Sequence, residues 1–490
     1  MKRKHLLITS LAGATALIVT GCGSSGDVTP SGKVKIKVDC QYGKSMRGLL
    51  STFADEFNAS QKKYEVSVDP DLSGTYNDIF KAEKTMLQDK ATDGWGDLVV
   101  CYPDHVVDYM LDFRAAANID KNGYDLYKDL SEKDLADLSD TARDQYDIDF
   151  PRTGKFVLPF STSTECMFYN PIILGLSLGA DVNEGKPITR SYINKLTWDE
   201  FCNVFCPALL EYNKTATKKI IDTSGDYSVL SYRDDNNFFI TLIEQYGYSY
   251  TSVDPTTRQA SLDFNTPEVK NLMKKFNGWK NQHYITSDGA VGGNQIGKWF
   301  KDRKTLFYVG STGGITYTQE SVGTEFEIEC GRLPQASNEE GRQKMISQGG
   351  SWCILEHEGK NKAARVKGCW EFYKYITEPN QCARWAATSG YYPIRRSTVR
   401  SAAWGKLIDE LDEDGEQKQG IDLLTARNAA YCADYDDILF TSAVFKGSSA
   451  ARDQAESLMT LILKSSVSEC ASKIDGWFND AINEIKKVMA

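Results

Sequence analysis

Hydrophobic and polar residues follow one another along the first hundred residues in a pattern that switches between the period of a strand and that of a helix. Apolar residues recur at every second position over 34–38 and 64–68, and they fill 98–101 without interruption. Between these runs they recur at helical spacing over 46–57 and 79–87. Strands that alternate with helices predict βαβ units, a mainly parallel sheet and an α/β fold.

Polar and aromatic side chains follow two of the predicted strands. Gln41, Tyr42 and Ser45 come after the first strand, and Tyr102 and Asp104 come after the third. Ligands of parallel sheets bind beyond the carboxyl ends of the strands, so these residues are candidate ligand contacts. Asp104 is equally compatible with a plain turn and a helix cap.

The middle of the chain predicts two strands separated by a polar interruption. Apolar residues suit strands over 154–160 and 167–170, whereas Ser161 to Glu165 are small or acidic and are costly to bury. We therefore expect residues 161–165 to lie at the surface. Further along, Thr197 can cap a helix, with Glu200 reciprocating in a capping box.

The second half continues the strand and helix patterns. Two short strands flank a turn within 246–264, and Thr266 is placed to cap the next helix. A strand over 306–309 precedes the glycine-rich run 310–314, which lacks the Lys-Ser/Thr ending of a phosphate-binding loop. This run therefore predicts close backbone approach rather than a nucleotide site.

Helical patterns fill the C-terminal part of the chain. An apolar face over 366–385 ends at Gly390 to Pro393, and an apolar stripe runs over 474–488. Such a stripe is typical of docking on the protein's own core, although an amphipathic membrane helix has the same spacing. Lys486 and Lys487 are too few for a polybasic membrane-binding helix.

The N-terminus has the order of a secretory signal. Basic residues 2–4 precede an apolar run over 6–19, which is too short for a comfortable membrane span and ends at Gly21-Cys22. A Cys directly after small residues resembles the lipobox of bacterial lipoproteins, in which this thiol is lipidated; an ordinary signal with a chance Cys is the alternative. Residues 23–33 then predict a flexible tether.

The charge of the chain limits its partners. The formal net charge is −10, and a nucleic-acid site needs clustered Lys and Arg, so we do not expect nucleic acid to bind.

Twelve Cys are unusual for an exported chain of this size. Several stand inside apolar runs, which favours buried free thiols over a disulfide framework. Cys202 and Cys206 share one helix face, but no His lies near them in the sequence, so we expect no metal.

Three landmarks around the middle segment carry a family resemblance. Leu158-Pro159, Tyr169-Asn170 and Thr197 to Phe201 occur in the order found in carbohydrate-type extracellular solute-binding proteins of ABC importers, the maltose-binding-protein-like family. The Asn-x-Pro-Glu helix start at 265–268, the strand before Gly310 and the helices ending at Pro393 resemble the same family.

The resemblance implies two α/β lobes joined by three crossings, which close on a solute like a hinge. The implied organisation is a signal and lipobox over 1–22, a tether over 23–33, a first lobe from 34–163 and 309–349, and a second lobe from 166–306 and 352–490.

The resemblance also implies a solute site between the lobes. Besides the residues after the first and third strands, we expect contacts from the loop that ends at Tyr76, from the hinge at 161–165 and from the polar group 233–237. Further contacts are expected from the glycine-rich run 310–314 and from the third crossing at 347–352. These contacts are Tyr76, Ser163, Glu165, Asn237, Ser311, Thr312 and Trp352.

The implied function is that of a monomeric receptor, lipid-anchored outside the cytoplasm through Cys22, which delivers a sugar or oligosaccharide to an ABC permease without a cofactor. A secreted lipoprotein enzyme acting on glycans is an alternative, although the Gly-x-Ser-x-Gly and His-Glu-x-x-His motifs are absent. A cell-surface adhesin of the same fold is a further alternative.

Overall fold

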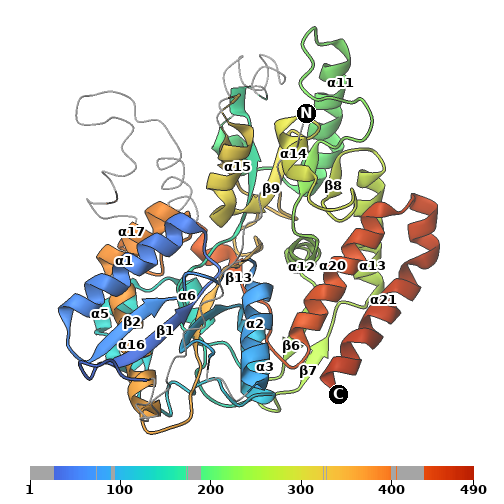
Figure 1. The fold of residues 1–490 in the computed structure, drawn as a ribbon. Helices are drawn as coiled ribbons and strands as arrows, with labels where there is room; N and C mark the ends of the chain where they lie inside the picture. Colours follow the sequence, from blue (N-terminus) through green and yellow to red (C-terminus); the bar gives the residue numbers. More distant parts are fainter. Residues whose placement is uncertain are drawn as a thin grey trace, which may run out of the picture.

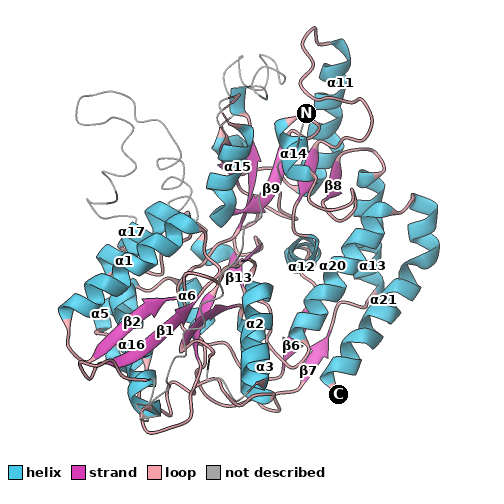
Figure 2. Cartoon of the chain, viewed as in Figure 1, coloured by secondary structure: helices cyan, strands magenta, loops and turns pink. Residues whose placement is uncertain are grey.

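The structure is a computed structural model that describes residues 27–72, 74–89, 94–172, 174, 189–323, 325–326, 328–398, 404 and 435–490. These residues form two lobes, each built on its own β-sheet with helices packed against it (Figure 1). Figure 2 shows the strands of the two sheets lying inside the surrounding helices. The predicted α/β, two-lobed architecture is confirmed.

The first lobe contains a four-stranded sheet in the order β12-β3-β1-β2. Strand β1 pairs in parallel with β2 and β3, as the alternating pattern predicts, and β12 adds antiparallel to β3. The strands are β1 (Val34–Asp39), β2 (Tyr64–Val68), β3 (Leu98–Cys101) and β12 (Ser351–Ile354). The helices are α1 (Lys44–Ser60), α2 (Tyr76–Gln88), α3 (Pro103–Leu111), α4 (Leu126–Asp129), α5 (Glu132–Asp137), α6 (Asp140–Tyr146), α16 (Lys362–Ile376) and α17 (Pro379–Ser389).

The second lobe contains a five-stranded mixed sheet in the order β10-β4-β9-β5-β8. Its strands are β4 (Glu165–Tyr169), β5 (Leu230–Tyr232), β8 (Ile285–Ser287), β9 (Phe307–Ser311) and β10 (Glu329–Gly331), and β6 (Thr251–Val253) with β7 (Ala260–Leu262) forms a separate hairpin. Its helices are α9 (Arg190–Ile193), α10 (Trp198–Glu200), the π-helical η1 (Phe201–Phe205), α11 (Cys206–Thr215), α12 (Asp235–Gln245), α13 (Pro267–Lys280), α14 (Ile296–Lys301), the 3-10 turn η2 (Thr312–Gly314), α15 (Ile315–Val322), α20 (Ser448–Lys464) and α21 (Val467–Met489).

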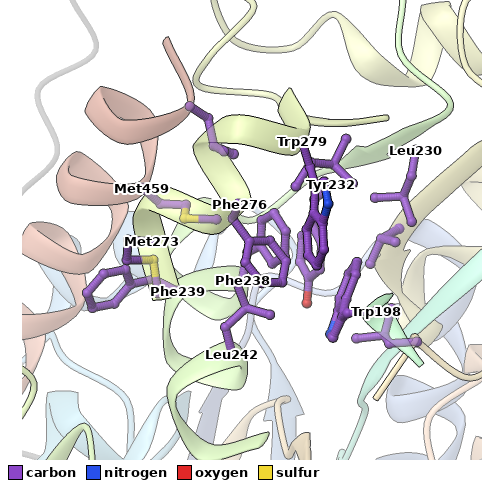
Figure 3. Close-up of a cluster of buried hydrophobic side chains, with 14 of the residues drawn as sticks. Trp198, Leu230, Tyr232, Phe238, Phe239, Leu242, Met273, Phe276, Trp279 and Met459 are labelled. Carbon is purple, nitrogen blue, oxygen red and sulfur yellow. The ribbon is translucent and has the colours of Figure 1, made fainter. Parts of the chain in front are cut away.

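Aromatic side chains dominate the core of the second lobe. Figure 3 shows Trp198, Tyr232 and Phe276 gathered in one cluster, and the ring centroids of Trp198 and Phe276 are 5.2 Å apart in an edge-to-face arrangement. The indole Nε1 of Trp198 donates to Gln245 Oε1 at 2.7 Å, which satisfies its buried N–H.

The predicted capping box is confirmed: Thr197 Oγ1 accepts from the Glu200 N–H, and Glu200 accepts from the Thr197 N–H.

The polar segment Ser161–Glu165 carries the chain from the first lobe to the second, but it is buried, and the prediction that it lies exposed is wrong. Each of its five side chains is at most 2% exposed. Its backbone pairs with a second crossing: Ser163 N donates to Gln348 O, and Gln348 N donates to Ser163 O, both at 2.7 Å. Tyr392 N also donates to Thr162 O at 2.6 Å. These bonds offset the cost of burying polar backbone.

Two predicted lobe limits are wrong because strand pairing brings distant segments together. Residues 309–349 were assigned to the first lobe, but β9 pairs with β4 and β5, so this segment builds mostly the second lobe. Residues 352–490 were predicted to belong to the second lobe, but the first part of this range lies in the first lobe. There β12 pairs with β3, and α16 packs on β1. Within the described part of this stretch, Tyr392, Phe445 and the helices α20 and α21 pack in the second lobe. The crossing that the resemblance implies between 306 and 309 therefore lies inside the second lobe.

The crossings meet in a small parallel pair of strands, β11 (Met345–Ile346) and β13 (Leu439–Phe440), preceded by the 3-10 turn η4 (Asp436–Ile438). Residues 347–350 connect β11 to β12 of the first lobe, and residues 399–403 and 405–434, which precede β13, lie outside the described residues.

Ten of the cysteines lie in the described part of the chain. All ten are free and buried, which confirms the expectation of buried thiols for these positions: Cys40, Cys101, Cys166, Cys202, Cys206, Cys330, Cys353, Cys369, Cys382 and Cys470. The predicted signal, the lipidation site Cys22 and the start of the tether lie outside the described residues.

Candidate ligand-binding site

A cleft of about 470 Å³ lies between the two lobes. The first lobe contributes the ends of β1 and β3 and the starts of α2 and α3, while the second contributes the start of α12, the end of β9 and one face of α20. The crossing residues Ser163, Gln348 and Gly349 form its base. A volume of this size is typical of a site for a small molecule.

Tyrosine rings form the first-lobe wall of the cleft. The rings of Tyr76 and Tyr102 lie 4.3 Å apart at 34° to one another. The hydroxyl of Tyr76 accepts from the N–H of Gly350 at 3.0 Å and lies 3.4 Å from the hydroxyl of Tyr391. Burial raises the pKa of Tyr76 and Tyr102, so both phenols are neutral at physiological pH. The hydrogen bond from Gly350 therefore holds the ring of Tyr76 in place in the first-lobe wall of the cleft.

Charged and amide side chains form the second-lobe wall. Arg233, Asp234 and Asn237 come from the turn after β5 and the start of α12, and Arg452 comes from α20. Arg452 donates to Asn237 Oδ1 at 2.7 Å, which joins the two elements. Desolvation raises the pKa of Asp234, while the charges of Arg233 and Arg452 lower it. Planar polar groups with both donors and acceptors therefore face the tyrosines.

One hydrogen bond closes the cleft across the lobes. Ser449 Oγ, at the start of α20, donates to Asp104 Oδ2 at 3.0 Å. Asp104 lies in the first turn of α3 and also lines the cleft. The two positions predicted for it, a helix start and a ligand cleft, therefore do not exclude one another.

The structure brings together seven of the twelve predicted ligand contacts. Their contact with a ligand stays a prediction. The residues that line the cleft are Gln41, Tyr76, Tyr102, Asp104, Ser163, Asn237 and Ser311.

The prediction that Trp352 stacks on a ligand is wrong. Its side chain is 0% exposed and packs edge-on against Tyr42, with the ring centroids 6.2 Å apart. Trp352 lies opposite Val100 in the β12–β3 pair, and the alternation of side chains along β12 directs it into the first-lobe core. Tyr42 is also buried, with its hydroxyl 2.9 Å from Ser161 Oγ.

Three other predicted contacts are not part of the cleft lining. Ser45 is exposed on α1. Thr312 is buried, and its Oγ1 accepts from the N–H of Thr164 at 3.2 Å. Glu165 is 0% exposed and accepts a short hydrogen bond from the hydroxyl of Tyr232. Burial raises the pKa of Glu165 well above its ordinary value.

The cleft also contains residues that sequence reasoning missed. Arg452, Asp453 and Glu456 lie on α20, in a part of the chain where no family landmark was found. Tyr391 belongs to the Gly390 to Pro393 landmark, which was interpreted as a helix stop alone. The sequence around Arg452, Asp453 and Glu456 alternates these charged residues with the buried Ala451 and Ala455. That pattern indicates a helix but does not indicate a ligand site.

Within the described residues, no group of three or more His, Cys, Asp or Glu side chains is arranged to hold a metal ion. Within the same residues, no helix has the length and apolarity needed to cross a bilayer.

Comparison with known proteins identifies a family. Residues 52–409 match the family model described as bacterial extracellular solute-binding protein. No curated protein matches the sequence.

Solved structures with the same fold include three at 14% identity and a TM-score of 0.63. A cyclic alpha-maltosyl-1,6-maltose binding protein from Arthrobacter globiformis aligns over 92% of this chain and 99% of its own. The sugar-binding protein MalE from Xanthomonas citri aligns over 93% and 99%. UgpB from Mycobacterium tuberculosis, solved in complex with glycerophosphocholine, aligns over 92% and 99%.

Proposed function

This chain belongs to the bacterial extracellular solute-binding proteins, and from that premise we propose that it is the receptor of an ABC importer for a neutral sugar or oligosaccharide. The observation that carries the proposal is the pairing of two unlike walls in one cleft: tyrosine rings on the first lobe and amide, carboxylate and guanidinium groups on the second. A sugar offers apolar C–H faces to rings and hydroxyls to planar polar groups, so it matches both walls at once.

The role of receptor is favoured over that of an enzyme. The family model that matches the chain describes binding proteins, and Glu165 is a fully buried carboxyl that is not part of the cleft lining. Hinged lobes joined by several crossings suit capture and release of a solute. Incubation with oligosaccharides, followed by chromatography, should therefore return them intact, and formation of hydrolysis products would overturn this assignment.

A thermal-shift screen against neutral mono- and oligosaccharides tests the proposed ligand class. A ligand at 100 times its dissociation constant adds about 2.7 kcal/mol to the stability of the bound state. Tyr76→Ala should abolish the shift. Tyr127→Ala is the matched control, because Tyr127 is 37% exposed on α4 and lies outside the cleft lining. A wild-type protein that responds to no sugar would refute the proposal.

The proposal includes a lipid anchor at Cys22 and an ABC permease as partner. An anchor with a flexible tether keeps a receptor at high effective concentration near its permease. Cys22→Ser should leave the precursor unprocessed by lipoprotein peptidase or release the protein into the medium. Membrane retention of a processed Cys22→Ser protein would refute lipidation at this residue.

A further inference from the structure

The described chain begins in a turn that packs on the start of β1, within a stretch that the sequence predicts to be tether. Residues 27–33 form this turn: Val28 bridges Val34, and Lys35 N donates to Asp27 O at 2.8 Å. The part of the chain that is left to act as a tether therefore ends before Asp27.

A buried ion pair holds this turn against the body of the first lobe. Arg365 Nη1, on α16, donates to Asp27 Oδ1 at 3.2 Å, and Arg365 Nη2 donates to Asp97 Oδ2 at 3.0 Å. Asp97 Oδ2 also accepts from the backbone N–H of Lys37, on β1, at 2.8 Å. Arg365 and Asp97 are both buried, so salt screens their attraction little and Asp27 is held at the sheet.

Covalent geometry limits the distance between Asp27 and the proposed lipid anchor. Five peptide links separate the Cα atoms of Cys22 and Asp27, and an extended chain spans at most about 3.6 Å per residue, or about 18 Å in total. This reach is shorter than the diameter of a small domain, which is about 30 Å. A lipid on Cys22 therefore keeps the Asp27 end of the first lobe next to the bilayer.

A lysine-rich groove of about 610 Å³ lies at the same end of the first lobe, between α1, the start of β2 and α16. Lys62 and Lys63 come from the loop before β2, and further lysines come from α16. Lys63 O accepts from Val34 N at 2.9 Å, which joins the groove to the strand that follows the turn 27–33. Figure 1 shows α1, β2 and α16 on the side of the first lobe that faces away from α20 and α21.

The groove is positively charged on a chain that is negative as a whole. Its lining contains two carboxylates, and one of them, Glu371, pairs with Lys374 at 3.0 Å; the other is Glu378. Three exposed lysines of the lining form no ion pair within the described residues: Lys62, Lys63 and Lys367. The formal net charge of the chain is −10, so an anionic surface repels the molecule as a whole while it attracts this groove.

We propose that this groove rests on the anionic phospholipid headgroups of the membrane, so that the receptor is held in one orientation with the base of its first lobe on the bilayer. The inference rests on the proposed lipid anchor at Cys22 and goes beyond it, because an anchor alone leaves the membrane-facing side undetermined. Each lysine near an anionic bilayer strengthens attachment by about fivefold, so the three unpaired lysines give a preference of about a hundredfold for this face.

Two labelled variants of the lipid-anchored protein report which face meets the bilayer. Ser60→Cys places a thiol in the groove lining without removal of a lysine, and Ser472→Cys places one on the exposed side of α21 in the second lobe. The ten described native thiols are buried, so a maleimide dye attaches to the new thiol. Wild-type protein, labelled in parallel, supplies the background, including any from Cys432, which lies outside the described residues.

The measurement is energy transfer from the dye to lipids with an acceptor on the headgroup, in phosphatidylcholine vesicles with and without phosphatidylglycerol. With phosphatidylglycerol present, transfer at residue 60 should exceed transfer at residue 472 by about threefold or more, because the groove faces the headgroups. Neutral vesicles, or about 1 M sodium chloride, should lower the transfer at residue 60 by about twofold or more, since the Debye length then falls to about 3 Å.

Charge reversal tests the lysines themselves. Lys62→Glu, Lys63→Glu and Lys367→Glu, combined in the Ser60→Cys protein, should lower its transfer on anionic vesicles to the level found at high salt. If this variant does not fold, glutamine at the same three positions decides.

The matched control reverses three exposed lysines of the second lobe at the ends of α20 and α21: Lys464→Glu, Lys486→Glu and Lys487→Glu. It has the same change of net charge and should leave transfer at residue 60 as in the parent protein. An equal loss in both variants would show that net charge alone determines the orientation, and would overturn the assignment of the groove.

The outcomes separate this inference from the anchor on which it rests. A protein that does not float with the vesicles would refute the lipid on Cys22 and the membrane contact with it. A protein that floats but transfers energy equally from both labels would overturn the contact and leave the anchor and the receptor function intact. Equal transfer together with a saturable thermal shift in inorganic phosphate would assign the groove to a soluble anion, which also overturns the membrane contact.

Discussion

Replacement of Gly349 by Ala should disrupt the pairing of the two central crossings. Gly349 has φ +102°, and a Cβ built on it lies 1.8 Å from the carbonyl oxygen of Ser161, which is backbone and cannot rotate away. A side chain in the left-handed region alone costs about 1–2 kcal/mol. Separation of the segments would also weaken the Ser163–Gln348 backbone pair and the bond from Ser161 N to Gly350 O, at about 1 kcal/mol each. We therefore expect a total loss of about 3–5 kcal/mol.

Gly359→Ala provides the matched control. Gly359 has a similar φ of +118°, but no atom lies within 4 Å of its added Cβ, so the substitution measures backbone strain alone. The free energy of unfolding is obtained from urea titration of both variants by circular dichroism. Gly359→Ala should lose about 1–2 kcal/mol. An equal loss in the two variants would show that the contact between the crossings contributes nothing, and would refute the reasoning.

Three other predictions concern buried side chains. Trp352→Ala should lose about 3–5 kcal/mol of stability in urea titration while ligand affinity, measured by calorimetry on the folded protein, stays within a few fold; an affinity loss without destabilisation would return Trp352 to the site. Burial raises the pKa of Glu165 above its ordinary 4.5, so the native state retains a proton that the unfolded chain releases, and this group makes stability fall as pH rises above about 4.5. Glu165→Gln should therefore melt like the wild type at pH 4 and at a higher temperature at pH 8, and an unchanged difference across that range would contradict the shift. The ten described thiols should react with a thiol reagent only on unfolding, and dithiothreitol should leave the melting temperature unchanged, whereas a decrease would reveal disulfides.

Local signals in the sequence predicted local structure well. The capping box of Thr197 and Glu200 and the Thr266 cap of α13 depend on residues three positions apart, and both form as expected. The parallel pairing of β1 with β2 and β3 also follows from the strand and helix pattern that lies between them.

Long-range pairing set the limits of prediction. The apolar run around Cys353 indicated a strand, but nothing in the run revealed that it pairs with β3, and that pairing buries Trp352. The polar composition of 161–165 favoured exposure because the backbone partners at 348 and 392 are distant in sequence. Arg452 reached the cleft by the same kind of long-range packing, between α20 and α12.

The position of β12 in the first sheet affects the order in which the chain can fold. Residues 98–101 have their antiparallel partner only at 351–354, and α16 covers β1 from 362–376. Until these late segments leave the ribosome, β3 lacks its outer neighbour and the first core lacks much of its apolar cover. Such long loop closures slow folding and keep early segments open. The N-terminal lobe is therefore completed only after most of the second has been synthesised, which leaves a long interval in which the chain is still unfolded enough to be threaded across a membrane.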